Sequence, residues 1–323
     1  YGLNCLRVPF HYNLVEKSPY RFPSADIRYL DQVVRWAEKY KIWVILDLHA
    51  APGAQNHDWH SDSSGEIELW TRLANQKRTF AIWEFLADRY KDKEWVAGYD
   101  VLNEAVISDP RPLNQFYKKL IKVIRNVDRN HLLFIEGNHW AQDIACLDPI
   151  EDDHYVLSVH HYEPLNFTFN FTFHLHYPVD TKTIKCNKDI LRAHLEKYYL
   201  ESKKRKAPIL VGEFGVNYRK GFFNEQQWVQ DALACFHDFG FHWAYWTYKA
   251  IKNSFYPDGV FSYEPNPPWV NRGGPVTGWN TYSRLWPTRK KDMCESWHTD
   301  QFAKNDFILQ ALQNASRKYH ESK

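Results

Sequence analysis

Residues 97–104 read Ala-Gly-Tyr-Asp-Val-Leu-Asn-Glu, and residues 208–214 read Pro-Ile-Leu-Val-Gly-Glu-Phe. In both stretches a short apolar run, typical of a strand buried on both faces, ends in a glutamate, Glu104 or Glu213. Each run leads into a loop-like segment and then into a helical pattern. Because the carboxyl ends of parallel strands open on one face of a barrel, we expect the two carboxylates to share that face.

Strand and helix patterns alternate along the rest of the chain. The predicted strands cover residues 4–8, 43–48, 97–102, 132–135, 155–159, 208–211 and 243–248. The clearest helical patterns cover residues 25–40, 75–90, 113–127, 188–199, 225–239 and 301–319. This alternation predicts an α/β fold of parallel βαβ units, a (β/α)8 TIM barrel. Seven strands are one short of a closed barrel, so we expect the first strand and its helix to lie upstream of residue 1. An open doubly wound sheet is disfavoured, because no Gly-rich phosphate loop follows any strand.

One segment lacks a clear periodicity. Residues 250–299 follow the last predicted strand and contain several tryptophans and prolines. Long segments of this kind in compact domains usually have a function, so we interpret residues 250–299 as a long loop on the active face. The chain as a whole, residues 1–323, is predicted to be a single catalytic barrel domain.

Composition narrows the class of partner. The formal net charge of the 323 residues is +2, with acids and bases interspersed, which favours neither nucleic acid nor an anionic membrane as partner. No apolar run approaches the roughly 18 residues that a membrane helix needs. The 14 Trp and 20 Tyr suit sugar binding, because a ring face can cover the C–H face of a pyranose, although a ring-rich core is the alternative interpretation.

Three Asn-x-Ser/Thr sequons indicate possible N-glycans, at Asn166, Asn170 and Asn314. With two sequons in one polar, aromatic segment, we expect a secreted, extracellular or lysosomal glycoprotein. The chain has no signal peptide or initiator Met, so we expect the native start to lie elsewhere. No Cys-x-x-Cys occurs. Three cysteines lie in loop-like segments, so the sequence is compatible with one disulfide between two of them: Cys146, Cys186 and Cys294.

Side chains that can take part in catalysis or ligand binding follow nearly every predicted strand. They are Arg7, His49, Asn103, Glu104, Glu136, His160, His161, Tyr162, Glu213 and Trp246. One buried histidine or glutamate is usually an ordinary hydrogen-bonding group, but the whole set at one end of a sheet predicts a site. Two carboxylates there can cleave a glycosidic bond, one as acid/base and the other as nucleophile. We interpret the third carboxylate, Glu136, as a hydrogen-bonding support.

The order and spacing of these motifs resemble glycoside hydrolase family 5, the retaining, cellulase-like family of (β/α)8 barrels. The matching motifs are Leu6-Arg7-Val8-Pro9, Asp47-Leu48-His49, Leu102-Asn103-Glu104, His160-His161-Tyr162, Val211-Gly212-Glu213-Phe214 and Tyr245-Trp246. Residues 48–56 are similar to the corresponding stretch of exo-β-1,3-glucanase-like and endoglycoceramidase-like members. Ala105 is a departure, since the family commonly has proline after the Asn-Glu pair.

The resemblance implies a role for each motif residue. Glu104 would be the general acid/base, with a raised pKa, and Glu213 the ionised nucleophile, their carboxyl groups about 5–5.5 Å apart. By the same resemblance, Asn103 would hydrogen-bond the sugar 2-hydroxyl, and Arg7 and Tyr162 would hold Glu213 in place. His49 and His160 would bind further hydroxyls of the cleaved sugar, and Trp246 would lie beneath its ring.

The predicted function is therefore that of a retaining glycoside hydrolase. It would cleave β-glucosidic bonds in β-glucans or related oligosaccharides through a covalent glycosyl-enzyme, without cofactor or metal. The alternatives are an endoglycoceramidase-like or exo-β-glucosidase activity on glycolipids or short glucosides, a carbohydrate-binding barrel without turnover, and a metal-dependent amidohydrolase. Histidines at residues 57–60 and 174–176 could ligate zinc, but they lie in loops without an ordered carboxylate set, so no metal is expected.

Overall fold

The computed structural model describes residues 2–272 and 282–321. The chain divides into two compact units. The N-terminal unit comprises residues 3–160 and 198–212, and the C-terminal unit comprises residues 1–2, 161–197 and 213–323. The prediction that residues 1–323 form a single domain stays a prediction.

A parallel sheet forms the centre of the N-terminal unit. Its strands are β1 (Cys5–His11), β2 (Trp43–Ala50), β3 (Val96–Asp100), β4 (Leu132–Glu136), β5 (Tyr155–His161) and β8 (Ile209–Phe214). The strands follow one another in the order β1-β2-β3-β4-β5-β8, and β9 (His242–Tyr245) is next in that order. The pairs from β1 to β5 are all parallel. The predicted α/β class and all seven predicted strands are therefore confirmed, with ends shifted by a few residues.

The strands form where the sequence is continuously apolar. In β2 the residues from Val44 to Leu48 are all buried, which fits a strand covered on both faces. Ile45, Phe134, Val156 and Leu210, each from a different strand, pack together as a core cluster. This core fixes the strands side by side, so their carboxyl ends meet at one edge.

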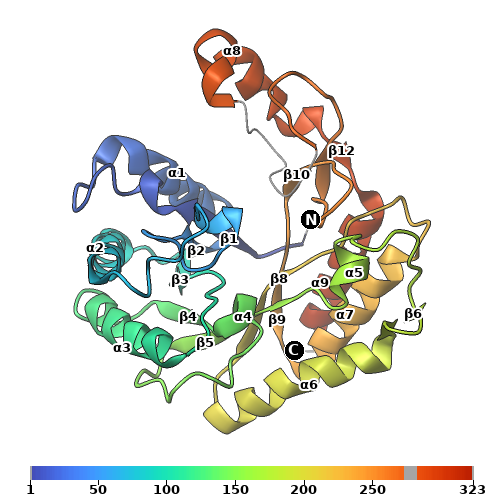
Figure 1. Cartoon of the computed structure of the whole chain (residues 1–323), viewed down its shortest axis with the longest axis horizontal. Coiled ribbons are helices and arrows are strands. Elements are labelled where there is room, and N and C mark those ends of the chain that lie inside the picture. Colours follow the sequence, from blue (N-terminus) through green and yellow to red (C-terminus); the bar gives the residue numbers. More distant parts are fainter. Residues whose placement is uncertain (1, 273–281, 322–323) are drawn as a thin grey trace. The chain divides into compact units, whose positions relative to one another are not determined.

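Helices connect the strands of the N-terminal unit. Those that lie along one side of the sheet are α1 (Ser24–Tyr40), α2 (Leu73–Tyr90) and α3 (Arg111–Arg125) (Figure 1). The indole of Trp83 on α2 is fully buried and donates a hydrogen bond to the carbonyl of Val101 at 2.9 Å. The remaining elements of this unit are η1 (Tyr12–Leu14), η2 (Trp59–Ser61) and α4 (Asn138–Ala141). Helix α6 (Lys188–Arg205) has residues in both units.

The C-terminal unit contains more regular structure than the sequence predicted. Its elements are α5 (Leu165–Thr168), β6 (Val179–Asp180), β7 (Lys185–Cys186), α7 (Glu225–Phe239), β10 (Lys249–Ile251), β11 (Phe261–Tyr263), α8 (Tyr282–Ser296), η3 (Thr299–Gln301), β12 (Ala303–Lys304) and α9 (Asp306–Glu321). Strands β10, β11 and β12 form a small sheet. The interpretation of residues 250–299 as a loop is thus corrected, because β11 and α8 lie within them, while residues 273–281 fall outside the described residues.

All five cysteines of the chain are free thiols, so the disulfide that the sequence left open does not form. Within residues 2–272 and 282–321, none of the helices combines the length and the apolar character that crossing a bilayer requires.

Candidate active site

Arg7, within β1, lies among three buried carboxylates. Its Nε donates to Asp100 Oδ2 at 2.8 Å, and its Nη2 lies 3.2 Å from Asp47 Oδ1 and 3.1 Å from Glu136 Oε1. Burial, with the charge of Glu136, raises the pKa of Asp100 well above its usual value. Burial also opposes the charge of Asp47, but Arg7 and His49 outweigh it and lower the pKa of Asp47. This cluster fixes the guanidinium beneath the residues that follow β3.

Arg7 orients Asn103. Its Nη2 donates to Asn103 Oδ1 at 2.8 Å, so the carbonyl end of the amide points at the guanidinium. The fully buried Nδ2 of Asn103 has no hydrogen-bond partner in the part of the chain that the structure describes. A buried donor without a partner costs free energy, and a ligand hydroxyl would satisfy it. The geometry therefore suits the predicted contact with a sugar hydroxyl.

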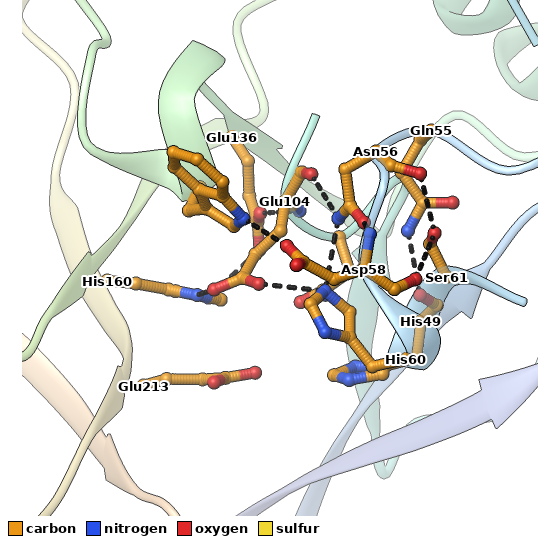
Figure 2. Close-up of polar contacts among 12 residues, drawn as sticks. His49, Gln55, Asn56, Asp58, His60, Ser61, Glu104, Glu136, His160 and Glu213 are labelled. Atoms are coloured by element: carbon orange, nitrogen blue, oxygen red, sulfur yellow. Dashed lines mark hydrogen bonds and ion pairs between the residues drawn. The ribbon is translucent and has the colours of Figure 1, made fainter. Parts of the chain in front are cut away.

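The Glu104 carboxylate lies between two imidazoles, as Figure 2 shows. His160 Nδ1 is 2.6 Å from Oε1, and His60 Nε2 is 3.0 Å from Oε2. Burial favours the neutral acid, but the hydrogen bonds from His160 and His60 outweigh it and hold the pKa of Glu104 well below its usual value. The expectation of a raised pKa at Glu104 is therefore wrong, because two imidazole partners stabilise the carboxylate.

Glu136 supports this arrangement from the end of β4, as predicted. Its Oε2 accepts a hydrogen bond from the backbone N–H of Glu104 at 2.5 Å, and its Oε1 contacts both Arg7 and His160 at 3.1 Å. His160 thus has a carboxylate partner at each ring nitrogen. His160 therefore holds Glu104, and its contact with a sugar hydroxyl stays a prediction.

The loop after β2 supplies contacts that the sequence did not reveal. Asn56 Nδ2 donates to the backbone carbonyl of Glu104 at 2.8 Å and lies 3.0 Å from His60 Nε2 (Figure 2). The ring of His49 is oriented through its Nδ1, which is 2.8 Å from Asp47 Oδ2. His60 and Asn56 follow no strand directly, so only the folded path of the loop brings them to Glu104.

In the C-terminal unit, Glu213 lies near the end of β8 and is 5% exposed. The hydroxyl of Tyr162 donates to Glu213 Oε2 at 2.8 Å, which confirms the predicted contact between these two residues. His161 instead stacks on Trp228, and burial lowers the pKa of His161 to about 3, so its ring is neutral. The Trp246 side chain is half-buried, and the backbone N–H of Trp246 donates to the carbonyl of Phe214 at 2.8 Å.

Several predictions about this site stay predictions. They are the spacing of the Glu104 and Glu213 carboxyl groups, the contact of Arg7 with Glu213, and the sugar contacts of His49 and Trp246. The other loop histidines have local partners. His57 Nδ1 lies 3.2 Å from the carbonyl of Gly65, and the rings of His174 and His176 contact the ring of Phe223.

Known proteins with similar sequences are glycosidases. The sequence model "Cellulase (glycosyl hydrolase family 5)" matches residues 1–252. A β-xylosidase of Phanerodontia chrysosporium is 31% identical over 77% of this chain and 54% of its own length. Endoglucanase C of Acetivibrio thermocellus is 27% identical over 79% of this chain and 82% of its own length. The chain thus spans about half of the first relative and most of the second.

A solved structure shows the same fold. Thermotoga maritima Cel5A, in complex with cellobiose, gives a TM-score of 0.66 at 21% identity over 95% of this chain and 84% of that one. This likeness confirms the predicted (β/α)8 barrel class. The family match confirms the predicted enzyme class, an O-glycosyl hydrolase. This chain belongs to the cellulase family, glycosyl hydrolase family 5.

Proposed function

We propose that this protein is a retaining glycoside hydrolase that cleaves β-glucosidic bonds in β-glucans or related oligosaccharides. The observation that carries the proposal is the Asn103-Glu104 pair in the segment that follows β3. Arg7 orients the amide of Asn103, and two imidazoles hold the carboxyl group of Glu104. An amide donor beside a proton-handling carboxyl group is what hydrolysis of a glycosidic bond requires on one side of the sugar.

The proposed reaction uses two carboxylates. Glu213, held by Tyr162, attacks the anomeric carbon while Glu104 protonates the leaving oxygen. A water molecule then gives its proton to Glu104 and releases the sugar from Glu213 with the original configuration. Asn103 donates to the 2-hydroxyl, and the ring of Trp246 lies beneath the sugar.

The substrate class is proposed from the names of the relatives. Relatives bear the names endoglucanase, β-xylosidase and glucan 1,3-β-glucosidase, so β-linked glucans are the first choice and short β-glycosides the second. A glycolipid substrate remains the alternative, because the C-terminal unit exposes several aromatic rings, namely Phe171, Phe173 and Phe222. A product profile on cello-oligosaccharides, laminari-oligosaccharides, xylobiose and glucosylceramide separates these classes.

The mechanism is tested with an aryl β-cellobioside or β-glucoside. We expect proton NMR to show the β-anomer as the first product and a 2-fluoro glycoside to label Glu213. Glu213→Ala should lower kcat by about 10⁴-fold or more while substrate binding persists. Azide should rescue Glu104→Ala, because azide needs no general base.

The matched control is Glu151→Gln, which neutralises an exposed carboxylate in the same unit as Glu104 and should leave turnover unchanged. Binding without turnover by the unaltered protein would make it a carbohydrate-binding barrel. Silencing by a chelator would instead indicate a metal-dependent amidohydrolase.

We also propose that the protein is secreted or lysosomal and carries N-glycans at Asn166 and Asn314. Asn314 is exposed and Asn166 is partly exposed, whereas Asn170 is buried, donates through Nδ2 to the carbonyl of Ser254, and accepts from Arg219. An amide already used in this way suits no glycan. Peptide mapping after enzymatic deglycosylation should show modified Asn166 and Asn314, and an unmodified Asn170. Expression without any glycan would count against both parts of the proposal.

A further inference from the structure

A second histidine contacts the proposed acid/base from the loop between β2 and α2. His60 Nε2 lies 3.0 Å from Glu104 Oε2, opposite the side on which His160 contacts Oε1 (Figure 2). The loop that carries His60 is tightly bonded. The buried hydroxyl of Ser61 donates to the carbonyls of Asn56 and Asp58 at 2.9 Å, and the indole of Trp140 donates to Asp58 Oδ2 at 2.6 Å.

The orientation of Asn56 shows what His60 can do. Its Oδ1 accepts from the N–H of Asp58 at 2.8 Å while its Nδ2 donates to the carbonyl of Glu104, so the amide group cannot be flipped. The same Nδ2 lies 3.0 Å from His60 Nε2. A protonated Nε2 therefore has an acceptor in Glu104, and a bare Nε2 has a donor in Asn56.

We propose that His60 is a positioning residue for Glu104 that also holds the proton which Glu104 passes between the glycosidic oxygen and water. This inference rests on the function proposed above. A hydrogen bond that only fixed the carboxyl group would need one partner at Nε2. The two partners present, an acceptor and a donor, satisfy that nitrogen both with and without its proton.

The proton balance is simple. As the glycosidic bond breaks, the His60 imidazolium gives its Nε2 proton to the Glu104 carboxylate, which delivers a proton to the leaving oxygen and stays ionised, and His60 becomes neutral. In the second step the attacking water gives its proton to Glu104, and that proton returns to His60 Nε2. Over one turnover no proton is gained or lost by the pair.

The charged and titratable groups around His60 come from several elements. The ring of His49, from β2, lies 5.6 Å from that of His60, centroid to centroid. His160, from β5, contacts the other oxygen of Glu104 and joins it to Glu136 of β4. Asp58, in the same loop, is held by Trp140. Hydrogen bonds from His160 and His60 keep the pKa of Glu104 low, so the carboxyl group alone holds a proton only at low pH, whereas the ordinary pKa of an imidazole is about 6.5.

The test compares two substrates with His60→Gln, whose amide can donate to Oε2 but cannot release a proton. A phenyl β-glycoside needs an acid for its leaving group, and a 2,4-dinitrophenyl β-glycoside does not. We expect kcat/KM to fall about tenfold or more for the phenyl substrate and less than about threefold for the dinitrophenyl substrate. The basic limb of the pH profile for the phenyl substrate should move to lower pH.

The matched control is His154→Gln, which alters an exposed histidine bonded to the carbonyl of Arg129 and should change neither substrate. Equal losses on both substrates, or an unmoved basic limb, would overturn the role of His60. If the unaltered protein hydrolyses neither substrate, the proposed function fails instead.

A second measurement does not depend on the folding of a His60 variant. In protein labelled with ¹⁵N at histidine, the Nε2 resonance of His60 should report a shared proton and change its titration in Glu104→Gln. An identical titration curve in both proteins would also overturn the proposal.

Discussion

At the residue scale, Asp47 and Asp100 contact the same guanidinium, and yet their pKa values are shifted in opposite directions. Both side chains are fully buried. Asp47 Oδ2 also lies 2.8 Å from His49 Nδ1, whereas the negative charge of Glu136 repels an ionised Asp100. Burial and that like charge raise the pKa of Asp100, while Arg7 and His49 lower that of Asp47 against its burial. One arginine cannot fully offset three buried carboxylates, so the protonated form of Asp100 is more favourable than in an ordinary aspartate.

This difference predicts the effects of two matched substitutions. At about pH 7, Asp100→Asn should change the free energy of unfolding by less than about 1 kcal/mol, because asparagine resembles the protonated acid. Asp47→Asn should cost about 3 kcal/mol, because it removes a charge that Arg7 and His49 need. Urea unfolding measures both values. Equal costs for the two variants would show that Asp100 is ionised.

The pH dependence follows with opposite signs. The lowered pKa of Asp47 stabilises the fold above its unfolded pKa of about 3.9, and this stability is lost as the pH falls through its folded pKa. The raised pKa of Asp100 makes the folded state bind a proton that the unfolded chain releases, so stability declines as the pH rises from about 4 through its folded pKa. Asp100→Asn should abolish that decline, and unfolding at several pH values would detect it.

The residues whose partners were predicted correctly from the sequence share one property: they lie directly at the end of a strand. Glu136 and Tyr162 have the partners expected of them, because strand direction alone brings such residues to one edge. The positions of His60 and Asn56 beside Glu104 depend on how the loop of residues 51–62 folds back. Hydrophobic periodicity in the sequence does not predict the path of such a loop. The pKa of Glu104 was predicted with the wrong sign for the same reason, since His60 was not among its expected partners.

At the element scale, the packing of β8 beside β5 depends on Gly212. A Cβ at this position would lie 2.8 Å from Ser158 Oγ and 3.3 Å from His160 Nε2. The first distance is too short for a real contact, and the second requires the imidazole to shift. Glycine here leaves room for the ring that holds Glu104.

Gly212→Ala should therefore lower activity more than stability. We expect kcat to fall about tenfold or more because His160 is displaced from Glu104, while overpacking costs about 1–3 kcal/mol of unfolding free energy. Steady-state kinetics and urea unfolding measure the two effects.

The double variant Ser158→Ala/Gly212→Ala gives the control. The buried hydroxyl of Ser158 has no hydrogen-bond partner among the described residues, so its removal alone should be nearly neutral. In the double variant it should restore part of the stability. Additive effects of the two substitutions would show that the alanine methyl group meets something other than Ser158.

Sequence patterns predicted the strands of the large sheet, but they missed the short strands of the small sheet and the 15-residue helix α8. All seven strands of the large sheet were foreseen, because each is a continuous apolar run. The strands within and beside residues 250–299 were missed, since β10 and β11 have three residues each and show no measurable alternation. Their hydrogen-bond partners lie far along the chain, so tertiary pairing and not local pattern decides them.

At the scale of the whole molecule, the five cysteines differ in exposure: Cys186 and Cys235 are buried, whereas Cys5 and Cys146 are partly exposed. Burial raises the thiol pKa of Cys5 and Cys186 to about 12 and that of Cys235 to about 11, and it also raises that of Cys146. Cys294 is exposed. Because the thiolate is the reactive form, these environments predict very different rates with a thiol reagent.

Thiol titration tests this arrangement over the entire chain. At about pH 8, Ellman's reagent should modify one thiol of the native protein rapidly and the other four slowly, and Cys294→Ser should remove the fast phase. In guanidinium without reductant all five thiols should react, because none is paired in a disulfide. For the same reason a reductant should leave the melting temperature unchanged. A count of three in guanidinium would instead reveal one disulfide.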